Sequence, residues 1–540
     1  IGEIGRAVGG IKGMEPDQAA EIVQKIQKFL REETRLGIPA LFHEECLSGY
    51  MAKRATTFPQ AIGLASTWNP ALIQKITSVI KEQMKQTGVH HALSPLLDVC
   101  YDPRWGRVEE TFGEDPYLVA SMGVSYVKGL QGKNLKEGII ATGKHFAGHG
   151  FSEGGRNRSP VHVGEREFRD VFLFPFEACV KIARLASIMN AYHDIDGVPC
   201  ACSKKLLTDI LKKEWGFDGI VVSDYGAINM LYNFHFVAKD KKHAGILALK
   251  AGIDIELPRI DCYEELVEAV KEGLISESTI DKAVFRILKI KFEKGLFEEN
   301  FEKKKIYFDT RKERNLARKV ARESIVLLKN NGILPLPENI KSISIIGQPA
   351  DDTRFYFGDY AYTAHLDLES PSVKCKSILE VAKERIGKRK VFYAKGCEIE
   401  KFSKDGFEEA KKVAEKSEVI IIVCGDIMVE SVTLEPKTYQ EFIDAVGTKM
   451  KEPHKKFGNY AKRLATIVKR VVNPSKGMWQ PWWTIGARVF GFAHKGHNID
   501  VCKAVATSLA DEMGVDPGKA EELAEAIYNN LAYILGEKSK

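Results

Sequence analysis

Short apolar runs alternate with amphipathic stretches from residue 1 to about 300, and this alternation constrains the fold more than any other feature of the sequence. Helix signals separate the runs: Glu114 and Pro116 are typical of a helix start, and Ile280 opens an apolar stripe at helical spacing. Repeated strand-then-helix order is typical of a parallel sheet with right-handed crossovers. We therefore predict an α/β protein that begins with a (β/α)8-type barrel. The runs of strand length lie at 38–42, 92–99, 139–142, 186–190, 220–223 and 253–257.

Polar clusters follow three of these runs. The apolar residues 220–222 lead directly to Asp224, while DPRWGRVEETFGEDP (102–116) and GKHFAGHG (143–150) follow two earlier runs. The carboxyl ends of barrel strands meet at one face, where active sites lie. We expect the three clusters to converge there and to form a sugar pocket. Taken alone, Asp224 has a structural alternative, because an aspartate after a strand can also cap the next helix.

Further motifs are spread along the chain at LGIPALFHEE (36–45), FPQ (58–60), SIMNAY (187–192), AGIDIELP (251–258) and SIVLLKN (324–330). Together with the polar clusters they make residues 1 to about 426 resemble glycoside hydrolase family 3, in its bacterial β-xylosidase and β-glucosidase branch. The resemblance implies a catalytic barrel followed by the opening half of an α/β sandwich domain. The segment after residue 436 is not recognised, and its pattern indicates mostly helices.

The resemblance assigns roles to several residues. Asp224 is implied to be the nucleophile of a retaining glycosidase, which also needs a second carboxyl group roughly 5 Å away to give and take the proton. Lys144 and His145 are implied to bind hydroxyls of the cleaved sugar, although such a pair alone is also typical of a surface ion pair. Arg107 is implied to contact the same sugar through its planar fork.

Tyr192 matches a tyrosine that restrains the nucleophile, and Glu45 matches an acidic residue that binds the distal hydroxyls of the sugar. A glutamate there, in place of aspartate, extends the carboxylate by one methylene and favours a pentose over a hexose. Arg104 and either Glu109 or Glu110 are expected as supports or internal ion-pair partners.

The proton donor is the least clearly marked part of the site. Most of the family supplies it from a Gly-Glu-Ser-x-Asp loop shortly after the position of Asp426, whereas this chain has GDIMVESVTLE at 425–435. Glu430 is the nearest match and is the predicted acid/base. The alternative is that Glu430 is a solvated loop residue and that no acid/base is present. The barrel would then belong to a catalytically impaired carbohydrate-binding protein.

Composition excludes several other classes. The formal charge of +6 is small for 540 residues and is spread along the chain, which argues against a nucleic-acid partner. Ten cysteines without a CxxC pair favour reduced, buried thiols, and no metal site or cofactor is expected. No apolar run is long enough to cross a bilayer. We expect a cytoplasmic protein, and the start at Ile1 leaves open a signal peptide that has been removed. A homodimer is also left open.

These observations predict a catalytic barrel at 1–300, a linker at 301–311, a partial sandwich domain at 312–435 and a helical segment at 436–540. The predicted function is that of a retaining exo-β-glycosidase, which hydrolyses terminal β-linked xylose or glucose from oligosaccharides through a glycosyl-enzyme on Asp224. Besides the glycosidase and the catalytically impaired carbohydrate-binding protein, a third hypothesis is that the unrecognised segment makes the chain an interaction or scaffold protein.

Overall fold

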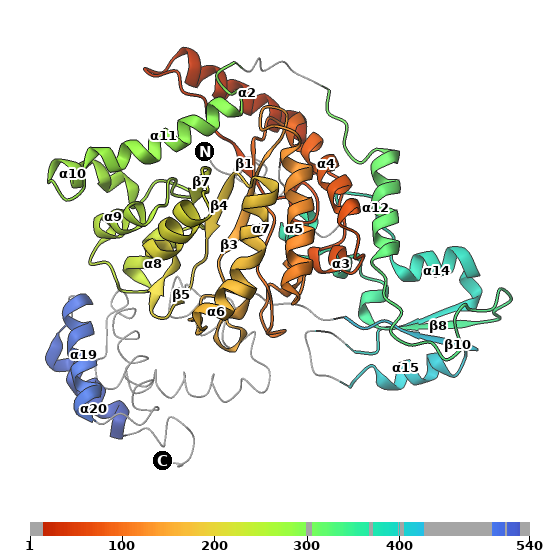
Figure 1. Ribbon diagram of the computed structural model, residues 1–540. Helices are drawn as coiled ribbons and strands as arrows, with labels where there is room; N and C mark the ends of the chain where they lie inside the picture. Colours follow the sequence, from red (N-terminus) through yellow and green to blue (C-terminus); the bar gives the residue numbers. More distant parts are fainter. Residues whose placement is uncertain are drawn as a thin grey trace. The chain divides into compact units, whose positions relative to one another are not determined.

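A computed structural model describes residues 14–298, 305–366, 371–397, 399, 404–425, 499–513 and 516–529 (Figure 1). The chain divides into two compact units, Ile1–Ser431 and Val432–Lys540. The first unit contains a five-stranded sheet and a three-stranded sheet. The domain boundaries at 300, 311 and 435 stay predictions.

The larger sheet is parallel throughout, with the strand order β1-β2-β3-β4-β7, and its strands come in the order of the predicted runs. A bridge between Val222 and Ile255 adds the run at 253–257 beyond β7. The α/β, (β/α)8-type fold is thereby confirmed. The strands are β1 (His43–Glu44), β2 (His91–Ala92), β3 (Ile140–Phe146), β4 (Ser187–Asn190) and β7 (Ile220–Val222).

Two predicted runs differ from the observed strands. The run at 38–42 ends just before β1, and the run at 92–99 is regular strand only where it overlaps β2. Pro95 interrupts the second run because proline has no backbone N–H to donate to a ladder. Pairing with β3 nevertheless continues, since the N–H of Leu97 donates to the carbonyl of Lys144 at 2.7 Å.

Helices pack on the outside of this sheet (Figure 1). The helix α5 begins where the sequence predicts, because Asp115 accepts a hydrogen bond from the N–H of Leu118 at 2.7 Å and Pro116 occupies the first turn. Ile73, Met122 and Phe176 belong to the core between the helices and the strands. The helices are α2 (Pro16–Glu32), α3 (Ala61–Ala65), α4 (Pro70–Gln86), α5 (Pro116–Gln131), α6 (Glu165–Glu167), α7 (Phe174–Ala183), α8 (Ala227–Asn233), α9 (Lys241–Ala251), α10 (Leu266–Lys271) and α11 (Glu277–Glu293), with a π-helical stretch at Lys205–Glu214 between β4 and β7.

The two edges of the larger sheet approach each other. His43 in β1 contacts the hydroxyl of Tyr225, which follows β7, with 2.8 Å between Nε2 and the oxygen. Lys291 in α11 donates to the carbonyl of Pro39 at 2.8 Å. The sheet therefore curls toward closure, as a barrel requires, and the strand ends surround a common centre.

The smaller sheet has the strand order β10-β8-β9 and is also parallel. Its strands are β8 (Ile343–Ile346), β9 (Val391–Ala394) and β10 (Val419–Ile422), with α14 (Ile378–Ile386) and α15 (Phe407–Ala414) in the crossovers. Before it, α12 (Arg311–Glu323) begins with a capping box formed by Thr310 and Glu313. The segment between β8 and α14 contains the short helix α13 (Tyr362–His365).

In the second unit the described residues form two helices, α19 (Ile499–Met513) and α20 (Pro517–Asn529), which pack against each other. Asp516 accepts a hydrogen bond from the N–H of Gly518 at 2.8 Å at the start of α20, and Leu523 and Ile527 are buried. Among the helices of the described residues, none has both the length and the apolar character that a bilayer crossing requires.

Candidate active site

Asp224 lies two residues beyond the end of β7, on the loop that leads into α8. Its Oδ1 accepts hydrogen bonds from the hydroxyl of Tyr192 at 2.8 Å and from the N–H of Tyr225 at 2.7 Å. Its Oδ2 is buried without a hydrogen-bond partner among the described residues, and Nε2 of His145 lies 3.6 Å away. Two donors therefore fix one oxygen of the carboxylate and leave the other without a donor.

Opposing effects act on the ionisation of Asp224. Burial raises the pKa of its carboxyl group above the usual value, because a charge loses its hydration there. The positive charge of Arg107, the hydrogen bond from Tyr192 and the positive charge of Lys144 each lower the pKa again. The anion thus depends on its neighbours, since they supply the stabilisation that water supplies at an exposed site.

Lys144 and Glu45 form a buried ion pair across two strand ends. Nζ of Lys144, in β3, lies 2.7 Å from Oε1 of Glu45, which directly follows β1. The ring of Tyr360 lies 4.9 Å from the same Nζ atom. A buried ammonium needs a compensating charge, and both the carboxylate and the ring face provide negative potential. Because the ammonium has three donors, it can bind a ligand oxygen in addition to Glu45.

The protonation of His145 follows from its partners. Nη2 of Arg107 lies 3.2 Å from Nε2, and a guanidinium can only donate, so Nε2 accepts. The proton therefore resides on Nδ1, which lies 2.9 Å from Oδ2 of Asp98 and donates to it. Burial, followed by the charge of Arg107, lowers the pKa of His145 well below its usual value. His145 is a neutral imidazole in this network.

Arg107 is held by a carboxylate fork. Its Nε and Nη2 atoms lie 2.7 and 2.8 Å from the two carboxylate oxygens of Glu110, and both side chains are buried. A bidentate pair fixes the plane of the guanidinium as well as its position. Glu110 is therefore an internal ion-pair partner, as the sequence predicts. The predicted supporting role of Arg104 takes the form of an exposed pair with Asp102 at 2.6 Å.

A segment that follows β8 also reaches the site. The N–H of Asp359 donates to Oε1 of Glu109 at 2.8 Å, and the adjacent Tyr360 covers Lys144 as described above. The ring of Tyr360 stacks on His365, with ring centroids 5.2 Å apart. Residues from the segment between β8 and α14 thus form part of the wall around the strand ends of the larger sheet.

The structure brings together Asp224, Glu45, Arg107, Lys144, His145 and Tyr192, which are the predicted site residues that lie in its described part. Glu430 lies outside the described residues. No group of three or more His, Cys, Asp or Glu side chains is arranged to hold a metal ion anywhere in the described ranges.

Sequence reasoning missed Asp98 and Tyr360. Asp98 is the last residue but one of the run at 92–99 and is fully buried, so it carried a signal similar to that of Asp224, an acidic residue near the carboxyl end of an apolar run. Tyr360 had no comparable signal, since it lies in an irregular segment more than 200 residues from its partner Lys144 in the sequence.

Two family models match the chain. Residues 2–290 match the glycosyl hydrolase family 3 N terminal domain, and residues 325–473 match the glycosyl hydrolase family 3 C-terminal domain. The predicted end of the resemblance near residue 426 was therefore wrong. That limit rested on the departure of the loop at 425–435 from the family pattern and on the lack of a recognisable counterpart to the family's later strands, whereas the family model matches as far as residue 473.

Curated relatives and solved structures agree with these matches. A beta-xylosidase of Formosa agariphila is 39% identical over 72% of this chain and 57% of its own length, and a periplasmic beta-glucosidase of Salmonella typhimurium is 31% identical over 84% and 56%. A solved b-glucosidase from Erythrobacter marinus superimposes with a TM-score of 0.72 at 33% identity, over 78% of this chain and 59% of that one. The chain thus spans little more than half the length of these relatives.

Proposed function

The chain belongs to glycosyl hydrolase family 3, and from that membership we propose that it is a retaining exo-β-glycosidase that removes terminal β-linked xylose or glucose from oligosaccharides. The observation that carries the proposal is the state of Asp224, with Oδ1 fixed by two donors and Oδ2 buried without one. Such an oxygen suits a nucleophile, because its lone pairs are not engaged and its direction is set.

In the proposed reaction, Oδ2 of Asp224 attacks the anomeric carbon while the bond to the leaving-group oxygen breaks, and an ester links the sugar to the carboxylate. Water then attacks the same carbon and releases Asp224, so the configuration is retained. Tyr192 holds the carboxylate in line for both steps. Arg107 and Lys144 favour its anionic form, which is the form that can attack.

The sugar in the pocket would be held by the buried charges around Asp224. Lys144 and Glu45 offer a donor and an acceptor side by side, and together they suit adjacent hydroxyls. Neutral His145 is fixed by Asp98 and Arg107 and supports the same wall. Of the two sugars we place xylose first. The more similar of the two relatives compared above is a beta-xylosidase, at 39% against 31% identity for the beta-glucosidase.

We assign the proton transfer to Glu430, which supports departure of the leaving group in the first step and activation of water in the second. A general acid contributes roughly 10²- to 10⁴-fold to such a step. Aryl glycosides with good leaving groups need less of this contribution. They therefore separate the work of Asp224 from that of the proton donor.

The test is hydrolysis of nitrophenyl β-xyloside and β-glucoside by the purified chain, by Asp224→Ala and by the control Asp218→Ala. Asp218 lies just before β7, at the opposite end of the same strand, with an 85% exposed side chain. We expect turnover by the parent and by the control but none by Asp224→Ala. A 2-fluoro xyloside should form an ester on the peptide that contains Asp224, as detected by mass spectrometry.

Added azide tests the two roles separately. In Asp224→Ala, azide should restore cleavage and yield the α-glycosyl azide, because it attacks from the side that the carboxylate occupied. If the parent chain has no working acid/base, azide should accelerate its turnover and yield the β-glycosyl azide. If the folded protein binds xylose but shows neither turnover nor labelling, the proposed glycosidase activity is refuted and a carbohydrate-binding protein is favoured.

A further inference from the structure

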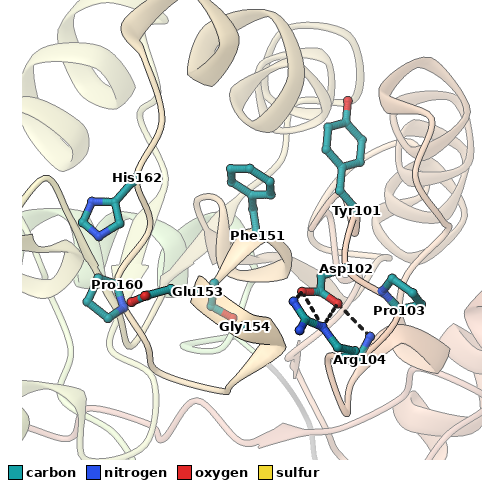
Figure 2. A pocket seen from close by; sticks show the side chains of 10 residues that line it. Tyr101, Asp102, Pro103, Arg104, Phe151, Glu153, Gly154, Pro160 and His162 are labelled. Atoms are coloured by element: carbon teal, nitrogen blue, oxygen red, sulfur yellow. Dashed lines mark hydrogen bonds and ion pairs between the residues drawn. The ribbon is translucent and has the colours of Figure 1, made fainter. Parts of the chain in front are cut away.

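A second hollow lies on the strand-end side of the larger sheet, between the loop that follows β2 and the loop that follows β3 (Figure 2). Its volume is about 400 Å³, within the range of small-molecule sites. Figure 2 shows Tyr101 and Phe151 on one side of it, and His162 with Pro160 on another. None of the predicted site residues in the described part of the chain lines this hollow.

The aromatic side of the hollow is rigid. The ring of Tyr101, a residue that is 41% exposed, meets Phe151 edge-on with centroids 6.0 Å apart. Both rings pack on Phe172, which is fully buried, at 5.7 and 5.0 Å. An exposed ring held in this way offers an apolar face whose side-chain entropy is already lost. Sugar rings, which have one apolar face, suit such a surface.

The wall of the hollow contains an unpartnered hydroxyl group. Ser152 lines the hollow and is only 3% exposed, and its Oγ has no hydrogen-bond partner among the described residues. A buried hydroxyl without a partner costs free energy, so its position favours a ligand that brings a donor or an acceptor. A saccharide hydroxyl can be either one.

The charges around the hollow disfavour an anionic ligand. Asp102 and Glu153 both line it, and the guanidinium of Arg104 is already paired with the Asp102 carboxylate through contacts of 2.6 to 3.2 Å (Figure 2). A phosphate or a nucleotide would meet two carboxylates and one compensated cation. Neutral hydroxyls, in contrast, can donate to carboxylates and accept from a guanidinium.

The loop at 152–162 contributes to the hollow and also reaches Tyr192. Glu153 and His162 of this loop line the hollow, whereas the guanidinium of Arg158 lies 4.8 Å from the centre of the Tyr192 ring. Trp105 is fully buried behind the loop and packs against His149 at 5.2 Å. The described residues that contact Asp224, namely Tyr192, Tyr225 and His145, are not part of the lining of the hollow.

From these observations we propose that the hollow is a second, non-catalytic saccharide-binding site, which holds a neutral sugar unit of an oligosaccharide or polysaccharide by stacking on Tyr101 and by a hydrogen bond with Ser152. The choice of β-linked xylan or glucan as the ligand rests on the proposed function. The site itself rests only on the hollow and its lining. It gives the protein a means to stay attached to a polymer while Asp224 acts on chain ends.

The test is affinity electrophoresis of the full chain in native gels that contain soluble xylan or soluble β-glucan. The Asp224→Ala variant serves as the background, so that the polymer is not degraded. We expect the polymer to retard this protein. Tyr101→Ala should weaken the binding by about tenfold. The free energy of one aromatic contact is about as large as the free energy that corresponds to a tenfold change in affinity.

Two further variants make the result specific. Ser152→Ala removes the hydroxyl and adds no bulk to the wall, and it should weaken binding as well. Tyr117→Ala is the matched control, since Tyr117 is 72% exposed in the first turn of α5 and does not line the hollow. In the polymer gel, Tyr117→Ala made in the Asp224→Ala background should migrate like Asp224→Ala alone. In the chain with Asp224 intact, Tyr101→Ala should hydrolyse nitrophenyl β-xyloside at the parental rate.

The outcomes separate this proposal from the proposed function. Unchanged retardation of both Tyr101→Ala and Ser152→Ala, or no retardation of the background protein by either polymer, would overturn the second site while turnover at Asp224 remained intact. Retardation that depends on Tyr101 in a chain without turnover would instead retain the second site and refute the enzyme.

Discussion

Replacing Tyr192 by phenylalanine removes one hydroxyl and tests how the structure controls Asp224. The hydroxyl donates to Oδ1 of Asp224 at 2.8 Å, in a site where burial raises the pKa of that carboxyl group. A hydrogen bond to a charged group contributes about 1.5–3 kcal/mol. Its loss leaves the N–H of Tyr225 as the remaining donor to Oδ1. The protonated form of Asp224 becomes favoured by the same amount.

The consequence appears in the pH dependence of kcat/KM. The nucleophile must be ionised, so activity falls as the pH drops through the pKa of Asp224, and a higher pKa moves this acid limb to higher pH. At a pH below the limb of the parent, Tyr192→Phe should lose about 10- to 100-fold in kcat/KM, because ~1.4 kcal/mol corresponds to tenfold. Above both limbs the loss should be much smaller.

The assay is hydrolysis of nitrophenyl β-xyloside across the pH range, stopped in alkali. Tyr263→Phe is the control, because the hydroxyl of this half-buried tyrosine donates to the carbonyl of Ile253 at 2.8 Å and makes no contact with Asp224. An acid limb of Tyr192→Phe that coincides with that of the parent would refute the reasoning. It would mean that the tyrosine only positions the carboxylate.

Three other predictions follow from the buried charges. Glu45→Ala leaves the buried ammonium of Lys144 without its carboxylate and should lower the free energy of unfolding, measured by urea denaturation, by about 3–5 kcal/mol. Adding Lys144→Met to this variant should restore part of the loss, because it removes the unpaired charge. Arg107→Lys loses the fork to Glu110 and should lower kcat/KM by about tenfold or more without unfolding the chain; an unchanged kcat/KM would contradict the role of the fork. Burial raises the pKa of Asp98 to about 7, so between about pH 4 and pH 7 the folded state holds a proton that the unfolded state has lost. Stability should therefore fall as the pH rises through this window, and it should fall less in Asp98→Asn; equal slopes for the two proteins would contradict this assignment.

The sequence determined the features that depend on local patterns. The order of strands and helices followed from periodicity, and α5 begins at Pro116 because its cap lies in the adjacent residue. Likewise, an apolar run that ends in an acidic residue is enough to place Asp224 at a strand end, and β7 lies as this pattern predicts. Such signals are local, because hydrogen bonds within a helix and alternation along a strand involve residues close in the chain.

Partners far apart in the chain were decided only by the tertiary structure. Lys144 has two neighbours that are distant in the sequence. They are Glu45, 99 residues earlier in the chain, and Tyr360, in the segment that follows β8 of the smaller sheet. The neutral state of His145 required the positions of both Arg107 and Asp98. No periodic pattern encodes these contacts, since they depend on how the strand ends and loops pack. The sequence therefore supplied the residue types of the site, and packing decided which of them act on one another.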